Sequence, residues 1–185
     1  MAERVCPWWL GYFLISPIRR LLQHPRAILQ PYVKEGMTVL EPGPGMGFFT
    51  LELARMVGAS GKVVAVDMQP RMLQTLKRRL RKRGFLSRVD VRLAKPESMD
   101  LGGFVNQVDF LLAFAIVHEF PDAGKFFGEA SATMKSGASL LLAEPRGHVD
   151  DAQFSAELEA AARVGLHKVE SPAIPRSLAA VLRKT

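Results

Sequence analysis

The feature that most constrains this fold is a repeated alternation of short apolar runs with longer segments of helical periodicity. The runs of strand length are 37–40, 62–66, 89–93, 108–115 and 139–143, and the helical segments are 48–57, 69–83, 121–134 and 150–164. Short buried strands that alternate with helices form a parallel sheet with helices on both faces. The sequence therefore predicts a single α/β domain built on a parallel sheet.

Glycines and the last two strands complete this prediction. Gly58, Gly84, Gly137 and Gly165 follow the four helical segments and predict where each of them ends. Two more strand-like segments, 166–171 and 177–182, are joined by only five residues. A parallel pair needs a crossover of about a dozen residues, so we expect these two strands to form an antiparallel hairpin.

Composition excludes several classes of protein. A chain of 185 residues that is 48% hydrophobic and 23% charged is typical of one globular domain and not of a disordered or fibrous protein. The one cysteine, Cys6, allows neither an internal disulfide nor a zinc site built on several thiolates. This cysteine usage favours a cytoplasmic protein. No spacing of His, Asp and Glu predicts a metal site.

Most of the net charge of +7 comes from six cations within residues 77–83. On a helix, six cations in seven residues point in nearly all directions, so their ordinary interpretation is a solvated helix end. The alternative is a phosphate-binding patch for RNA or for an anionic membrane surface.

The N-terminal region contains an apolar and aromatic run at residues 5–15. It is too short to cross a bilayer as a helix, which takes about 20 residues. Unlike in a signal peptide, the charge pair Arg19–Arg20 comes after the run and no A-x-A cleavage site follows it. We therefore assign residues 1–32 to a helical and aromatic cap, with Pro17 and Pro25 opening two short helices. The run should pack on the domain, line a substrate pocket or contact a membrane surface.

A glycine-rich turn, V-L-E-P-G-P-G-M-G at 39–47, lies where the first strand leads into the first helix. Gly43, Gly45 and Gly47 would let a ligand approach the backbone beyond the carboxyl ends of the strands. Asp67 ends the second strand, where a carboxylate can accept hydrogen bonds from both hydroxyls of a ribose. This combination predicts a nucleoside cofactor.

The identity of that cofactor follows from the glycine spacing and from Glu41. A dinucleotide site has the pattern G-x-G-x-x-G, whereas residues 43–47 have G-x-G-x-G. Glu41, just before the turn, would repel a pyrophosphate and attract an amine. S-adenosylmethionine has a ribose, an amine and no phosphate. It is therefore the predicted cofactor, and a nicotinamide dehydrogenase is disfavoured.

These motifs resemble those of class I S-adenosylmethionine-dependent methyltransferases, of the broad type that includes ubiquinone/menaquinone and other small-molecule methyltransferases. The resemblance covers residues 33–185. It implies a Rossmann-like three-layer sandwich, with a seven-stranded, mostly parallel sheet and an antiparallel strand from the C-terminal hairpin. V-V-A-V-D-M-Q matches the second family motif, which implies that Asp67 binds the ribose and Met68 flanks the adenine.

The same resemblance implies roles along the next strands. The region R-L-A-K-P-E-S-M should hold the adenine through the backbone at Lys95 and Pro96. An acid is common at the position of Lys95, and Glu97 is a substitute for it. The segment F-A-I-V-H-E-F-P, which begins at Phe114, should border both the cofactor and the methyl acceptor.

Candidate catalytic residues lie near the end of the fourth strand. His118 is the first candidate for a general base, which is needed only when the acceptor must lose a proton. Glu119 would orient His118, bind substrate or face solvent, and His148 would face the acceptor pocket or make a loop contact. In similar enzymes an N-terminal segment covers the site, which implies that Trp8 and Tyr12 line the substrate pocket or else simply pack on the domain.

The predicted function is methyl transfer to a small, apolar or aromatic acceptor. The chain has neither the N-P-P-Y or D-P-P-Y tetrapeptide of many amino-methylating enzymes nor the Pro-Cys pair of cytosine C5 enzymes. Two alternatives remain open. One is an RNA methyltransferase that uses the basic run at 77–83, and the other is a non-catalytic protein that binds S-adenosylmethionine.

Overall fold

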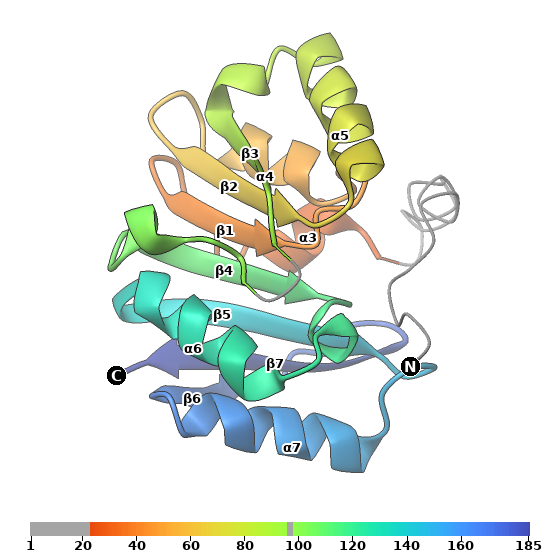
Figure 1. The fold of residues 1–185 in the computed structure, drawn as a ribbon, viewed down its shortest axis with the longest axis vertical. Coiled ribbons are helices and arrows are strands. Elements are labelled where there is room, and N and C mark those ends of the chain that lie inside the picture. The colour runs from red at the N-terminus through yellow and green to blue at the C-terminus, as the bar shows by residue number, and fades with distance from the viewer. Residues whose placement is uncertain (1–22, 96–97) are drawn as a thin grey trace.

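The structure is a computed structural model that describes residues 23–95 and 98–185 (Figure 1). Most of the predicted cap lies outside these residues, including Trp8, Tyr12 and the helix expected at Pro17. Pro96 and Glu97 lie outside them as well.

Within the described residues, seven strands form one sheet in the order β3-β2-β1-β4-β5-β7-β6. The strands are β1 (Thr38–Pro42), β2 (Lys62–Asp67), β3 (Val89–Leu93), β4 (Val108–Phe114), β5 (Met134–Pro145), β6 (Leu166–Glu170) and β7 (Ser177–Lys184). The first five are parallel, and β7 runs antiparallel to both β5 and β6. This confirms the predicted parallel sheet and the C-terminal hairpin.

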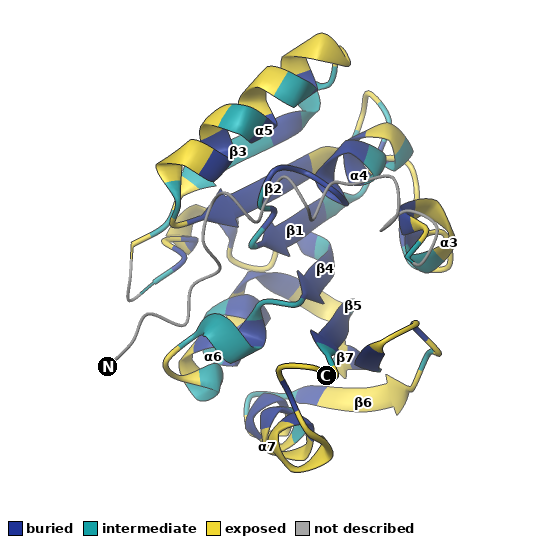
Figure 2. Ribbon diagram, turned by 90° about the vertical axis from the view of Figure 1, so that its right-hand side faces the viewer, coloured by how far each residue is buried: buried dark blue, intermediate teal, exposed yellow. Residues whose placement is uncertain are grey.

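Helices cover both faces of the sheet (Figures 1 and 2). The described helices are α3 (Pro25–Leu29), α4 (Thr50–Met56), α5 (Pro70–Lys82), α6 (Ala123–Thr133) and α7 (Asp151–Ala162), with single turns η1 (Leu86–Arg88), η2 (Gly102–Phe104) and η3 (Val117–Glu119). Successive strand side chains point to opposite faces, so Val39 packs in the core under α3, α4 and α5, and Leu40 in the core under α6 and α7. The predicted three-layer sandwich is confirmed.

Local capping explains where two of the helices start. The Asp150 side chain accepts from the backbone N–H of Gln153 at 2.8 Å, and the Gln153 side chain accepts from the Asp150 N–H at 3.0 Å. This capping box begins α7. Asp122 caps α6 in the same way, accepting from the Lys125 N–H at 3.1 Å.

The prediction that Gly137 closes the helix at 121–134 is wrong. Helix α6 ends at Thr133, and Met134 already belongs to β5, where it pairs with Val108. Gly137 lies inside that strand with a φ of +76°, where the pairing shifts before Phe110 meets Ser139. The glycine therefore supplies an irregularity within a long strand rather than a helix end.

The topology brings those predicted functional residues that the structure describes to one edge of the sheet. Strands β1, β2, β4 and β5 all end at this carboxyl edge, and β7 starts there because Ser177 pairs with Pro145. Helix α3, at the end of the predicted cap, packs with Leu29 fully buried in the core that α4 also joins.

Candidate active site

The three glycines of the turn between β1 and α4 have different surroundings. All have positive φ, and a Cβ at Gly43 or Gly47 would lie 2.5 Å from a side-chain atom of Ile116 or Leu76. These two glycines are therefore required by the packing of the chain itself. No atom lies within 4 Å of the Cβ position at Gly45, so open space adjoins the backbone there.

Asp67, at the end of β2, fixes this turn. Its Oδ2 accepts from the Gly45 N–H at 3.2 Å, and its Oδ1 accepts from the Gln69 N–H at 2.8 Å. Burial raises the pKa of Asp67, and the backbone hydrogen bonds of Gln69, Gly45 and Met68 oppose the rise. Each carboxylate oxygen keeps a second lone pair, so two ribose hydroxyls can still donate to it.

Glu41, in β1, is a buried acid whose Oε2 has no hydrogen-bond partner among the described residues. Burial raises the pKa of Glu41 to about 8, the neighbouring Thr50 side chain opposes the rise, and the charge of Asp67 adds to it. A buried carboxyl without a partner is costly to leave unsatisfied. Glu41 therefore fits a cofactor that brings a cationic amine.

The other residues expected beside the cofactor, Met68 and Lys95 at the adenine and Phe114 at the methionine part, are divided between surface and core. Met68 is 40% exposed, and the Lys95 side chain points to Asp100, with 3.3 Å between Nζ and Oδ2. The backbone N–H of Lys95 donates to Ser98 O at 3.0 Å. Phe114 is buried, with its ring centroid 4.5 Å from that of Phe49.

A left-handed residue shapes the exit of β4. Ala115 has a φ of +54°, which is unfavourable for a residue with a Cβ. The chain then turns through η3, which places the Ile116 side chain against Gly43. The N–H groups of Ile116 and Val117 donate to Glu144 Oε1 at 3.2 and 2.8 Å.

His118, in η3, contacts the same carboxylate. Its Nδ1 is hydrogen-bonded to Glu144 Oε2, and Glu144 is completely buried at the end of β5. Burial lowers the pKa of His118, but the hydrogen bond and charge of Glu144 outweigh burial, with Glu119 and Glu157 adding to them, so that the pKa is raised. The carboxylate that holds Nδ1 is therefore Glu144, while Glu119 contributes its charge. The exposed His148 has its ring centroid 5.3 Å from that of His118.

Glu157, on α7, completes this group. It is 8% exposed, and its Oε2 has no hydrogen-bond partner among the described residues. Burial raises its pKa to about 7, the charge of Glu144 adds to the rise, and that of His118 opposes it. We call His118, Glu144, His148 and Glu157 the acid–histidine cluster.

Glu144 and Glu157 were missing from the predicted site, although the sequence contains signals for both. The dipeptide Glu-Pro that ends β1 at residues 41–42 also ends β5 at residues 144–145. Glu157 lies three residues after Phe154 and four before Ala161, so it occupies the buried stripe of α7. A charged residue in such a stripe indicates a site or a buried partner.

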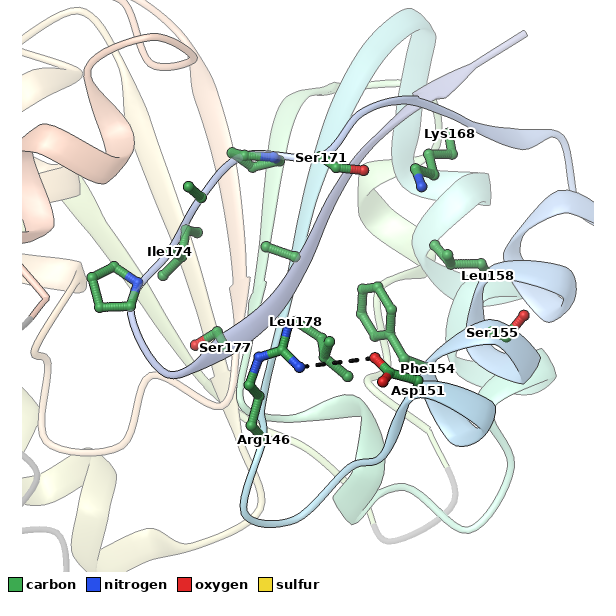
Figure 3. Close-up of a pocket in the computed structure, with 14 residues that line it drawn as sticks. Arg146, Asp151, Phe154, Ser155, Leu158, Lys168, Ser171, Ile174, Ser177 and Leu178 are labelled. Atoms are coloured by element: carbon green, nitrogen blue, oxygen red, sulfur yellow. Dashed lines mark ion pairs between the residues drawn. The ribbon is translucent and has the colours of Figure 1, made fainter.

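A pocket of about 690 Å³ lies between α7 and the loop joining β6 to β7 (Figure 3), and the four residues of the acid–histidine cluster are not among those that line it. Phe154 and Leu158 of α7 and Leu178 of β7 provide apolar wall, and Leu178 pairs with Glu144 across the strands. At one side of the pocket, Nη1 of Arg146 lies 3.9 Å from Oδ1 of Asp151. Gln23 donates to Pro175 O at 3.3 Å, so the described chain starts beside this loop at the carboxyl edge.

Two general features of the described residues bear on function. Across 23–95 and 98–185, no three His, Cys, Asp or Glu side chains are grouped so as to hold a metal ion. In the same ranges, each helix is too short or too polar to cross a bilayer.

The fold and this edge define a class I S-adenosylmethionine-dependent methyltransferase. Residues 33–176 match the family described as "Methyltransferase domain". The chain belongs to this family, and its methyl donor is S-adenosylmethionine. The resemblance seen in the sequence motifs is thereby confirmed.

Individual relatives support the same family. The chain is 30% identical over 112 residues to "Ubiquinone/menaquinone biosynthesis C-methyltransferase UbiE" of Idiomarina loihiensis, a match that covers 60% of this chain and 44% of the relative. The chain thus spans less than half the length of the curated relatives it matches. A SAM-dependent methyltransferase from Aquifex aeolicus has a TM-score of 0.82 at 27% identity, covering 96% of this chain and 100% of that one. A SAM-dependent O-methyltransferase from Thermotoga maritima shares the fold, with a TM-score of 0.66 at 19% identity over 100% of this chain and 68% of that one.

Proposed function

We propose that this enzyme methylates a small, apolar or aromatic acceptor that binds beside His118. The observation that carries the proposal is the contact between Ile116 and Gly43, two residues before His118. This contact fixes the β4 exit, with its histidine, against the turn where a cofactor would approach Gly45. A candidate base and a candidate cofactor site thus share one edge of the sheet.

In this proposal, the residues of the cofactor half of the site hold different parts of the cofactor. The bound cofactor supplies a methyl group on a sulfonium. Glu41 holds the amine directly or through water, Asp67 holds the ribose, and the open space at Gly45 admits both. Met68, Lys95, Pro96 and Phe114 border the adenine and methionine parts, as their family motifs imply.

The acceptor half contains the groups that bind the acceptor and manage its proton. His118 takes a proton from the acceptor where methylation requires its loss. Its side chain is 18% exposed, so the ring is reachable from solvent and from a bound acceptor. Glu119 and His148 lie at the rim of the same site.

The nature of the acceptor is supported by the relatives. The UbiE proteins are named for ubiquinone and menaquinone biosynthesis, which suggests a quinol-like ring as the first acceptor to test. In the proposal, the cap at 1–32 covers the domain at 33–185, and Trp8 and Tyr12 contact the ring. The contact of Gln23 with Pro175 supports this, because it holds the first described residue of the cap at the carboxyl edge. A cytoplasmic location is part of the proposal.

The position of the basic run disfavours an RNA acceptor. Helix α5 begins beside Asp67 at the carboxyl edge, and its 13 residues lead away from that edge. At 1.5 Å per residue, the cations at its end lie about 20 Å from its start. Arg79 differs from the other cations of the run, because its guanidinium donates to the carbonyl oxygen of Met46 in the glycine turn.

The proposed cofactor contacts can be tested by calorimetric titration with S-adenosylmethionine, S-adenosylhomocysteine and NAD. We expect binding of the first two only, weakened about 100-fold by Asp67→Ala because two charged hydrogen bonds are lost. Asp151→Ala, which removes a carboxylate that is 88% exposed, is the matched control. Equal affinity of the two variants would refute the role of Asp67.

The acceptor is tested with methyl-labelled S-adenosylmethionine and two probes, 1,4-naphthohydroquinone and bulk transfer RNA. Label in the quinol fraction supports the proposal. Label in the RNA, lost on neutralising Lys77, Arg78 and Arg81, would replace it with the RNA alternative. Cofactor binding with no transfer to either probe would favour the non-catalytic alternative.

A further inference from the structure

The hydrogen bonds of Glu144 determine which of its oxygens meets His118. Oε1 accepts from the backbone N–H groups of Ile116 and Val117 at 3.2 and 2.8 Å. Oε2 is therefore the oxygen that contacts His118 Nδ1. Because backbone N–H groups can only donate, they fix the orientation of the carboxylate, whose side chain is completely buried.

This orientation of the carboxylate selects one tautomer of the neutral imidazole. A carboxylate oxygen can only accept, so a neutral His118 must carry its proton on Nδ1 to make the hydrogen bond. The lone pair is then on Nε2, the ring nitrogen turned away from Glu144. A base that takes a proton from a bound acceptor needs this lone pair.

Glu157 provides a second, independent observation. Its carboxyl group is more than nine-tenths buried, comes from a different element of the fold, and has an Oε2 without a partner among the described residues. Glu144 from β5 contacts His118 directly, and the ring of His148 from the loop after β5 lies beside it. The charges of Glu119, in η3 itself, and of Glu157, on α7, act on the ring as well, and negative charge near a histidine favours its protonated form.

We propose that Glu144 is a positioning residue that holds His118 in the Nδ1–H form, and that Glu157 helps the resulting pair to retain a proton taken from the methyl acceptor. This inference rests on the proposed function and deepens it. It assigns to the site an acceptor that loses a proton on methylation, such as a phenol or enol, rather than a thioether or a tertiary amine.

The proton and charge balance is simple. The acceptor's X–H bond breaks as its X–CH₃ bond forms and the sulfonium S–CH₃ bond breaks. The proton goes to Nε2 of His118 and later to solvent. One positive charge disappears at sulfur and one appears on the imidazole, so the site keeps the same total charge beside its carboxyl groups.

The tautomer of His118 can be measured in the 185-residue chain without any acceptor. Long-range ¹H–¹⁵N correlation spectra distinguish Nδ1–H from Nε2–H imidazoles, and His118→Asn identifies the signals of this ring. We expect Nδ1–H in the wild type at a pH where the ring is neutral. Nε2–H in the folded wild type would overturn the inference, and this result needs no variant.

Glu144→Gln should change the tautomer of His118 from Nδ1–H to Nε2–H. The amide oxygen would keep the N–H groups of Ile116 and Val117, which leaves the NH₂ group to face Nδ1. Nδ1 must then accept, and the ring proton moves to Nε2. We expect more than a tenfold change in the ratio of the two forms and a fall in the pKa of His118 by about one pH unit. An unchanged ratio in the folded variant would overturn the positioning role.

Glu157→Gln should lower the pKa of His118 by less than Glu144→Gln and leave the proton on Nδ1. The matched control is Glu159→Gln, two residues along α7, which removes the same charge from a side chain that is 68% exposed and paired with Arg163. Equal effects of the two α7 variants would remove Glu157 from the inference.

Calorimetric binding of S-adenosylhomocysteine separates this inference from the proposed function. Wild-type protein that binds it but shows Nε2–H at His118 defeats the inference alone. Protein with the expected Nδ1–H form that binds no cofactor defeats the proposed function alone.

Discussion

Glu41 and Glu144 end two parallel strands at the same edge, and each is followed by proline, yet their surroundings are opposite. Glu144 has hydrogen-bond donors for both oxygens, whereas one oxygen of the equally buried Glu41 has none among the described residues. Burial raises the pKa of Glu41 to about 8. The comparison indicates that hydrogen-bond donors, rather than burial, decide whether a buried acid at a strand end stabilises or destabilises the cofactor-free fold.

The largest effect should come from the acceptor half. His118→Asn should slow methyl transfer by about 10²- to 10⁴-fold, since a general base is lost, while S-adenosylhomocysteine binding is unchanged. In the wild type, the rate should rise with pH and level off above the raised pKa of His118, because only the neutral ring accepts a proton. Initial rates measured across pH with an identified acceptor give both the loss of rate in the variant and the pH profile of the wild type. A pH-independent rate in the wild type would exclude His118 as the base.

Glu144→Gln should destabilise the protein by about 2 kcal/mol, because the ionic contact with His118 is lost. The pair stabilises the fold below pH 6.5, and this contribution is lost as pH rises through the raised pKa of His118. The destabilisation should therefore be larger at pH 5.5 than at pH 9. Urea denaturation at both pH values provides the measurement, with Glu159→Gln as the control.

In the cofactor-free protein, Glu41→Gln should instead raise the free energy of unfolding. Folded Glu41 holds its proton up to about pH 8, whereas the ordinary value is 4.5, so stability falls as pH rises between these values. Glutamine removes this loss, so the free energy of unfolding of the variant at pH 8 should be about 1 to 3 kcal/mol higher than that of the wild type. Thermal unfolding at pH 5 and pH 8 tests it, and destabilisation at both would break the comparison with Glu144.

The same variant should weaken cofactor binding and change its pH dependence. If Glu41 must lose its proton to hold a cationic amine, affinity for S-adenosylmethionine rises with pH up to about 8. Glu41→Gln should bind about tenfold more weakly and without this rise. Titrations in buffers with different heats of ionisation measure the released proton directly.

The smallest effect concerns Ala115. With a φ of +54°, Ala115→Gly should stabilise the fold by about 1 kcal/mol, because glycine adopts this conformation without strain. Ala113→Gly, two residues earlier in the buried strand, should instead destabilise it by a similar amount. The pair of variants in one denaturation series shows whether the turn under His118 stores strain.

Periodicity predicted the elements because their determinants are local. The bounds of β3 agree with the prediction, and the glycine turn and Asp67, which were predicted together from short motifs, are joined by the hydrogen bond from the Gly45 N–H. Gly137 was misread because a positive φ serves a helix end and an irregular strand equally. The partner of His118 depends on the left-handed turn at Ala115 and on α7 packing over β5, which no local pattern encodes.

The strand order also has a consequence for synthesis on the ribosome. Strand β7 is the last of the seven to be made, yet it lies between β5 and β6. Until it emerges, the Glu144 edge of β5 has no neighbour, and β6 has no strand to join. At 5–20 residues per second, the stretch from Glu170 to Lys184 takes roughly one to three seconds. An open strand edge can pair with a strand of another chain, so the edge of β5 is protected from such pairing only once β7 is in place.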